Sequence, residues 1–458
     1  MTCWLPVCLL CMPGNIMWDT GSSIGQFLGI VYVTPNNPYF LNFFYGSVAY
    51  LGKLLGSANI AVFVYCLLQS ALFIWLLSDM IAYIGERSAW AGYILLLLYG
   101  LAPIFPVYSM SMAKDTSLAA ALLIYLTLTL RAVAEPGFLT DSRNMFRVGM
   151  SIVLISLVRN QAGWLPAVIL LLYAVFVSKQ RTVIVSSAAV VLAVAFFTVF
   201  LPRALLIPRG ELRENMSAPL QTMAHYAMRH PEDMTDEDKQ IISCVIDYDT
   251  MIAKYDPEIS DPIKNIAVFD QDTTGPFITL WFSKFMKHPD TMAEGFYKST
   301  HVYLVPGEES TSKPHVTIGF DVYAKTKEYL GLSNVNPNLN TLRAYVRGWL
   351  DRPGLRLLVT IGLYTVILLC SLLLMLVFKN GRYILCLGPL MMVLVGCLFS
   401  PVNGYFRYAY AMIAGVPVLF ADMLVTIVGQ AKEKKLRLIF SGRGKKQKAR
   451  KKARRAEA

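Results

Sequence analysis

The sequence predicts an all-α polytopic membrane protein, and three observations carry this prediction. The chain of 458 residues is 55% hydrophobic and only 16% charged, whereas about a quarter of the residues in a soluble domain carry a charge. Apolar runs long enough to cross a bilayer recur along the chain. Basic residues gather in alternate connections between those runs. Because backbone groups in lipid must form hydrogen bonds within their own segment, we expect the runs to be helices.

We expect about ten transmembrane helices, the first of them short or truncated. Residues 1–13 are apolar but too short to cross a bilayer, and they lack a basic leader and a small-residue cleavage site. They are expected to be the C-terminal half of a first helix that begins upstream of this sequence. The other spans are expected at 58–84, 89–107, 115–133, 146–158, 163–178, 182–202, 355–378, 383–400 and 408–429.

Lys and Arg in short loops predict the orientation, because such loops stay in the cytoplasm. Basic residues such as Arg87, Arg143 and Lys379 fall in every second connection, and so does the basic C-terminal tail. The protein is therefore expected to be multi-pass with a cytoplasmic C-terminus. The other connections are expected outside, at 14–57, 107–115, 159–162, 203–354 and 401–407.

These expectations divide the chain into four parts. Residues 1–202 form an N-terminal membrane domain with a first outside loop at 14–57, and residues 355–429 form the C-terminal membrane helices. Residues 203–354 form one mainly helical extracytoplasmic soluble region. Residues 430–458 form a basic cytoplasmic tail.

Two patterns support helices in the soluble region. Thr235 followed by Asp238 is typical of a helix N-terminus with an acidic first turn. Residues 277–287 have the pattern of an amphipathic helix lying on the membrane surface. The side chains expected to face the lipid there are Trp281, Phe282 and Phe285.

The tail holds most of the net charge. From Ala431 to Ala458 it contains thirteen Lys and Arg and two Glu, a net of 13 − 2 = +11, so the rest of the chain is +12 − 11 = +1. Because the chain outside the tail is nearly neutral, it does not have the charge of a basic nucleic-acid-binding domain. No specific nucleic acid is therefore expected as a partner. We expect the free tail to be disordered and to adhere to anionic lipid headgroups, with RNA contact as the alternative.

Four short polar strings lie at the outside ends of expected membrane helices. Ionisable groups at membrane depth are unfavourable and usually functional. The strings come from segments far apart in the sequence, so their common side predicts one polar site at the outer leaflet, suited to a lipid phosphate. They are Trp18-Asp19, Lys114-Asp115, Arg159-Asn160 and Arg407-Tyr408.

Each string alone also has an ordinary structural explanation. Asp19 and Asp115 suit helix N-caps, because a carboxylate there accepts from free backbone N–H groups. Lys114 suits a side chain that extends to the headgroups, and Arg159 an interfacial anchor. A tyrosine beside Arg407 is common at a membrane interface. These explanations stay open at this point.

The sequence contains no disulfide framework and no metal motif. Seven of the eight cysteines lie in apolar stretches, and the five histidines show no metal-ligand spacing. No cofactor is therefore assigned, and a requirement for a divalent metal stays open.

Six stretches together resemble the GT-C superfamily of polytopic glycosyltransferases, and more closely an uncharacterised bacterial family of membrane proteins grouped with it. The resemblance extends over nearly the whole chain. It departs from relatives at the first helix and at Asn37, where many relatives have a histidine before the proline. The stretches are Pro13–Asp19, Met112–Asp115, Leu157–Asn160, Glu214–Gln221, Tyr255–Lys264 and Ser400–Tyr408.

The resemblance implies roles for individual residues. An acidic residue of the first outside loop acts as base or metal partner in GT-C enzymes, and this role falls on Asp19, with Asp115 as a second acidic candidate. Basic residues of the outer cavity bind the phosphate of the donor. The candidates for binding lipid phosphate or substrate are Lys114, Arg159, Arg407, Tyr408, Gln26 and Gln221.

The resemblance therefore implies a sugar transfer on the outer face of a bacterial cytoplasmic membrane. The donor is a polyprenyl-phosphate sugar, and the acceptor is a hydroxyl on a cell-envelope glycan or glycolipid. One alternative is a transporter or lipid flippase, which needs polar groups near the bilayer midplane. A non-catalytic envelope assembly protein is the other.

Overall fold

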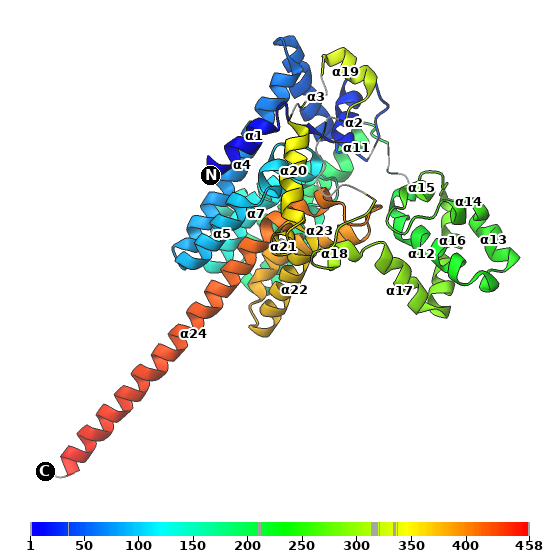
Figure 1. Ribbon diagram of the computed structural model, residues 1–458. Helices are drawn as coiled ribbons and strands as arrows, with labels where there is room; N and C mark the ends of the chain where they lie inside the picture. Colours follow the sequence, from blue (N-terminus) through cyan, green and yellow to red (C-terminus); the bar gives the residue numbers. More distant parts are fainter. Residues whose placement is uncertain are drawn as a thin grey trace.

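Most of the described residues are helical (Figure 1), and among them two strands of two residues each form a pair. The computed structural model describes residues 2–34, 36–208, 210, 212–312, 319, 321–332, 336 and 338–456, with side chains as far as residue 431. A single large core runs through the helix bundle, and a second core lies in a lobe at its side.

Residues 5–204 combine long helices with two short strands. Between α1 and α2, and between α6 and α7, the chain extends to form the strands. The elements are α1 (Leu5–Leu10), β1 (Asn15–Ile16), α2 (Trp18–Phe27), α3 (Tyr39–Leu54), α4 (Ala58–Gly85), α5 (Ala89–Leu101), α6 (Ile104–Ser109), β2 (Ser111–Met112), α7 (Lys114–Ala134), α8 (Ser142–Val158), α9 (Trp164–Tyr173), α10 (Arg181–Ala195) and α11 (Leu201–Ala204).

The C-terminal elements return from the lobe to the bundle. They are α18 (His301–Leu304), α19 (Ala324–Leu330), α20 (Leu339–Leu350), α21 (Pro353–Val359), α22 (Ile361–Val377), α23 (Ile384–Leu398) and α24 (Phe406–Ala456).

Five helical segments of the described chain are long and apolar enough to cross a membrane, and six if α21 and α22, bent by 66°, form one span. The sequence predicts about ten. The difference arises because several expected spans fall on shorter helices. Among them, α8 has 17 residues, and α5 and α9 are the other short apolar helices. Residues 5–10 of the first expected segment form only the six-residue helix α1.

The lobe, residues 212–298, is built from short helices around its own core (Figure 1). Its helix α13 begins with a capping box between Thr235 and Asp238, which confirms that sequence prediction. Leu220, Tyr226 and Phe277 are fully buried in this core. The helices are α12 (Ser217–Arg229), α13 (Asp236–Ser243), α14 (Tyr248–Ala253), α15 (Asp261–Lys264), α16 (Gln271–Lys287) and α17 (Pro289–Lys298).

Helix α16 differs from the amphipathic surface helix expected at 277–287. The Nε1 atom of Trp281 donates a hydrogen bond to Thr222 Oγ1 of α12 at 2.7 Å. Phe285 stacks on Trp281 and also packs against the core of the lobe, so only Phe282 is exposed. The prediction that all three aromatic side chains face lipid is therefore wrong. A buried indole N–H needs a hydrogen-bond partner, and the lobe supplies one.

The described residues between the lobe and α20 lie across the first outside loop. Helix α19 contacts α2 and α3. The backbone of Ile16 accepts from Asp321 N at 2.8 Å and donates to Gly319 O at 2.9 Å. The expected soluble region at 203–354 thus contains a lobe and a segment that covers β1 and α2.

The close approach of α2 to this segment depends on Gly21. A Cβ atom at Gly21 would lie 2.2 Å from the backbone oxygen of Asp321, which cannot swing away. We expect Gly21→Ala to lower the free energy of unfolding by about 1–3 kcal/mol. Thermal unfolding of the purified protein in detergent measures this. Gly275→Ala in α16 is the control, because its Cβ would meet nothing within 4 Å; an equal effect of both variants would contradict the packing argument.

The C-terminal tail continues α24 as a helix to Ala456 and projects away from the bundle (Figure 1). The prediction of a disordered tail differs from this structure. Lys, Arg, Ala and Glu are strong helix formers, and here they extend a helix already fixed by packing. The side chains of 432–458 lie outside the described residues, so the expected contact with anionic lipid stays a prediction.

Candidate functional site

A parallel strand pair aligns the starts of two helices. In the pairing of β1 with β2, Asn15 lies opposite Ser111 and Ile16 opposite Met112. Helix α2 begins two residues after β1, and α7 begins two residues after β2. Asp19 and Asp115 each lie three residues after a paired strand residue. The two carboxylates therefore occupy equivalent positions in two adjacent strand–helix units.

Buried polar side chains satisfy the non-helical backbone beneath these helices. Asn15 Nδ2 donates to Ser111 Oγ at 3.1 Å, and Gln69 Nε2 of α4 donates to the backbone oxygens of Ser109 and Ser111. Thr20 Oγ1 donates to Met112 O at 2.6 Å. Irregular backbone inside a membrane protein needs such internal partners, so this network fixes the place of both carboxylates.

Neither carboxylate is an N-cap. The N-cap residues of α2 and α7 are Met17 and Ala113, and neither makes a side-chain cap. Asp19 and Asp115 instead lie in the first helical turn, where a negative charge interacts favourably with the helix dipole. The N-cap explanation of these two residues is therefore wrong, and their side chains bond to cations.

Three cations meet the two carboxylates. Arg407, in the first turn of α24, places Nη2 2.8 Å from Asp19 Oδ2 and Nε 3.7 Å from Asp115 Oδ2. Lys114 Nζ lies 3.3 Å from Asp19 Oδ2. Arg159 Nη1, at the C-terminus of α8, lies 2.7 Å from Asp115 Oδ1. The expected proximity of the four strings is thus confirmed.

We call Asp19, Lys114, Asp115, Arg159 and Arg407 the charged cluster. With three cations and two carboxylates, its formal charge is 3 − 2 = +1. The side chains of Asp115 and Arg407 are 2% and 6% exposed, whereas that of Arg159 is 39% exposed. The cluster therefore has a buried centre and an accessible edge.

Asp19 is ionised in this setting. Burial alone would raise its pKa, but the positive charges of Lys114 and Arg407, and their hydrogen bonds to the carboxylate, lower the pKa well below its ordinary value. The group therefore carries a negative charge at neutral pH. A ligand anion that binds here competes with Asp19 for the same two cations.

Two aromatic rings flank the central guanidinium. The Cζ atom of Arg407 lies 4.6 Å from the ring centroid of Tyr405 and 5.1 Å from that of Tyr408. Such contacts hold an arginine while leaving its N–H groups directed elsewhere. Arg407 Nε and Asp115 Oδ2 are buried atoms without a hydrogen-bond partner among the described residues. The two atoms lie 3.7 Å apart, so they form an ion pair without a hydrogen bond.

A cavity of about 200 Å³ lies beside Arg159. Its lining combines Arg159, Gln161 and Tyr408 with apolar side chains of α7 and α23, including Leu118 and Val393. A charged edge next to an apolar cavity suits an amphiphile whose headgroup is anionic.

Gln26 and Gln221 lie outside the charged cluster. Gln26 accepts from Asn42 Nδ2 at 2.8 Å and from Thr34 N at 3.2 Å, so its amide holds the first outside loop together. Gln221 Nε2 donates to Asp256 O at 2.9 Å within the lobe. The structure does not bring these two amides to the site. Substrate binding by either stays a prediction.

Sequence reasoning missed several groups at the site. The backbone oxygen of Asn36 accepts from Lys114 Nζ at 3.2 Å, and Tyr405 packs on Arg407. The strand pairing was missed as well. A signal for it is present, since Asp19-Thr20 and Asp115-Thr116 repeat the same dipeptide at the two helix starts.

A group that could hold a metal ion lies away from the cluster. In the described part of the chain, His230, Asp233 and His288 of the lobe bring ligand atoms within 4.8 Å of one another. Lys287 Nζ already pairs with Asp233 at 2.5 Å, and a positive charge there opposes a cation. No metal role is assigned to the charged cluster.

Comparison with known proteins gives one family. The model of "Family of unknown function (DUF6020)" matches residues 29–455. The chain belongs to this family. No curated protein matches it.

Two solved structures are similar at a distant level. ArnT from Cupriavidus metallidurans in the apo state has a TM-score of 0.33 and 14% identity, with 93% of this chain and 75% of that chain covered. ArnT from the same organism bound to undecaprenyl phosphate has a TM-score of 0.32 and 14% identity, covering 92% and 77%.

Proposed function

We propose that this DUF6020 member is a GT-C-type membrane glycosyltransferase. It moves a sugar from a polyprenyl-phosphate donor to a hydroxyl of a cell-envelope glycan or glycolipid. One observation carries the proposal: Arg407, almost fully buried, bonds Asp19 and faces Asp115 at the start of three helices. Helix starts and a guanidinium both favour phosphate.

The balance of charge favours an anionic headgroup. The cluster has one more cation than it has carboxylates. The donor's phosphodiester carries one negative charge, which would neutralise this excess. Its prenyl chain would enter the cavity lined by Leu118 and Val393, beside Arg159.

The reaction assigns a separate task to Asp19. When the donor phosphate forms ion pairs with Lys114 and Arg407, it replaces the Asp19 carboxylate as their partner. It then accepts the proton of the acceptor hydroxyl while that oxygen bonds to the anomeric carbon. The bond from the anomeric carbon to the phosphate oxygen breaks, and its electron pair stays on the phosphate. Arg407, Lys114 and Arg159 stabilise the charge that develops there.

Cleavage of the donor tests this function. The purified protein is placed in liposomes with a polyprenyl-phosphate sugar and envelope extract, and free polyprenyl phosphate is measured by mass spectrometry. We expect time-dependent release of polyprenyl phosphate together with transfer of the sugar to extract material. Donor that crosses the bilayer uncleaved would contradict the proposal and favour the transporter alternative. Unchanged donor on both sides would favour the non-catalytic assembly protein.

The proposed reaction also needs the site on the outer side of the membrane. Cys244 is an exposed cysteine of the lobe, and the lobe is expected outside. We expect a membrane-impermeant maleimide to label the protein in intact cells at this residue. Cys244→Ser is the matched control and should remove the label. Labelling of Cys244 only after the membrane is opened would contradict the orientation.

A further inference from the structure

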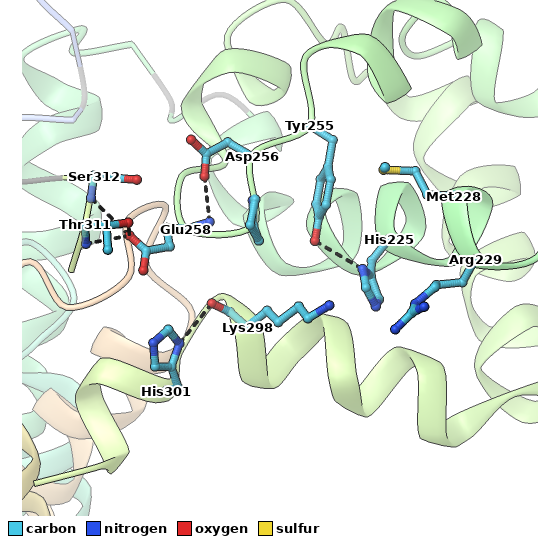
Figure 2. Close-up of a pocket in the computed structure, with 11 residues that line it drawn as sticks. His225, Met228, Arg229, Tyr255, Asp256, Glu258, Lys298, His301, Thr311 and Ser312 are labelled. Carbon is cyan, nitrogen blue, oxygen red and sulfur yellow. Dashed lines mark hydrogen bonds between the residues drawn. The ribbon is translucent and has the colours of Figure 1, made fainter. Parts of the chain in front are cut away.

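A second cavity lies in the lobe, at its junction with the bundle. It has a volume of about 730 Å³, which is within the usual range of ligand sites. Its walls come from α12, α17, the 255–258 loop and residues 311–312 (Figure 2). The charged cluster does not contribute to this lining.

The two carboxylates in the lining are already engaged. Glu258 Oε2 accepts from Ser310 Oγ at 3.0 Å and from the backbone N–H groups of Thr311 and Ser312 at 2.9 and 3.1 Å. Asp256 Oδ1 accepts from Glu258 N at 2.8 Å. Residues 310–312 thus bind the Glu258 carboxylate, and the Asp256 carboxylate is directed toward the backbone of its own loop (Figure 2).

The cations in the lining are less fully engaged. Figure 2 shows Lys298 extending from α17 toward His225 and Arg229 of α12. One carboxylate outside the lining, Glu294, pairs with Arg229 at 2.9 Å and with Lys298 at 2.8 Å. These three groups have a formal charge of 2 − 1 = +1, whereas the whole lining, with Asp256 and Glu258, holds two cations and two carboxylates, so the positive charge is local to the end of the cavity at Arg229 and Lys298. Both cations are partly exposed and can turn toward a ligand.

A buried ring lies between these cations and the loop. His225 is 4% exposed, and Tyr255 Oη lies 3.3 Å from its Nδ1. Gly295 permits this packing, since a Cβ there would lie 3.0 Å from His225 Cβ. The cavity thus presents cations together with a tyrosine ring. Cations in the cavity suit the acidic substituent of a sugar, and polar and aromatic side chains suit the sugar ring.

The cavity is connected to the charged cluster through one loop. Asn403 N donates to Glu258 O at 2.8 Å, and Asn403 Nδ2 lies 3.0 Å from His301 Nδ1 of the lining. Arg407 follows four residues later, so its Cα lies within about 14 Å of that of Asn403. A saccharide of a few units could extend from the lobe cavity to the cluster.

We propose that the lobe cavity binds an anionic saccharide, through Arg229 and Lys298, and thereby positions the acceptor. The acceptor role rests on the proposed glycosyl transfer, whereas the binding itself does not. Glu294 acts as the internal competitor, because it holds the same two cations when the cavity is free.

Binding by the full-length protein in detergent tests this proposal. The probe is trigalacturonic acid, measured by isothermal titration calorimetry. The neutral galactose trisaccharide of the same linkage and inorganic phosphate are the comparison ligands. We expect binding of the acidic trisaccharide that weakens with salt, and at least tenfold weaker binding of both comparison ligands. Equal binding of the neutral trisaccharide, or of phosphate alone, would overturn the proposal.

Three variants sharpen the test because their expected effects differ in sign. Arg229→Gln and Lys298→Gln should each weaken binding several-fold. Glu294→Gln should strengthen it several-fold, which a purely structural role of Glu294 would not produce. Lys239→Gln, in the same lobe but outside the lining, is the matched control. Weaker or unchanged binding in Glu294→Gln would contradict the competition argument.

The binding test and the donor-cleavage test can give different results, so each proposal can fail without the other. The variant Asp19→Asn should bind the acidic trisaccharide as tightly as the original protein, because Asp19 lies outside the cavity. Donor cleavage without acidic-saccharide binding would overturn this inference and leave the transfer standing. Acidic-saccharide binding without donor cleavage would support the binding site and overturn its role in glycosyl transfer.

Discussion

Arg407→Ala is expected to lower sugar transfer by about 10²–10³-fold, because the variant removes the guanidinium from a developing phosphate charge. It should also destabilise the protein. Asp115 is almost fully buried, and Asp19 bonds to Arg407 at 2.8 Å. Removing one partner from a buried ion pair typically destabilises a protein by about 3–5 kcal/mol. Transfer assays and thermal unfolding of the purified variant measure the two effects.

A second variant separates catalysis from folding. Arg407→Lys keeps the positive charge near the carboxylates but loses the planar fork, so it should retain most of the stability and still transfer poorly. Arg131→Ala is the control, since Arg131 pairs with Asp79 at 2.7 Å near the other end of α7. That pair lies about 25 Å along the helix from the cluster. Normal transfer by both Arg407 variants would contradict the proposal that the charged cluster is the active site.

Asp19→Asn is expected to change two measurements in opposite directions. The amide cannot accept the proton of the acceptor, so transfer should fall by about 10²–10⁴-fold. Donor binding should be retained or become tighter, because Lys114 and Arg407 lose the carboxylate that competes with the donor phosphate. The measurements are donor cleavage and the affinity for a polyprenyl-phosphate sugar.

The pKa of Asp19 adds a pH dependence to this prediction. Lys114 and Arg407 lower that pKa well below its ordinary value, so the carboxylate stays ionised as the pH falls toward 4. In the protein without donor, the carboxylate that competes for these cations therefore stays charged, and donor affinity should not rise in mildly acidic buffer through protonation of Asp19. A variant Asp19→Asn that binds donor less tightly and transfers normally would contradict the role given to this residue.

The convergence of the charged strings could be predicted from the sequence because orientation follows a simple rule. Arg87, Arg143 and Lys379 are predicted to lie on the cytoplasmic side of the membrane, which places Asp19 and Arg407 together on the other side. The contact between them, across 388 positions of sequence, agrees with that expectation. The roles of these residues in catalysis stay predictions.

The local geometry of the site could not be predicted in the same way. A strand of two residues, such as β1, has no periodicity, so the repeated Asp-Thr dipeptide at Asp19 and Asp115 does not by itself specify that two strands pair beside it. The N-cap explanation failed for a related reason. A carboxylate at a helix start suits a cap and a first-turn position equally well, and the nearby cation decides between them.

Other differences have physical causes in tertiary packing. Trp281 has the spacing of a lipid-facing residue, but the lobe offers it Thr222 as a hydrogen-bond partner. The lobe cavity was missed because Arg229, Lys298 and Glu258 are far apart in the sequence and carry no shared motif. Fewer described helices are long enough to cross a membrane than the apolar runs predict, because an apolar run does not fix the length of its helix.

Binding of the lipid phosphate to the charged cluster is the central claim, and native mass spectrometry measures it most directly. The purified protein is mixed with equal amounts of polyprenyl phosphate and the corresponding polyprenol. We predict that the phosphate form binds preferentially and that Arg407→Lys loses this preference while Arg131→Ala keeps it. Equal retention of both lipids by the original protein, or an unchanged preference in Arg407→Lys, would contradict the account.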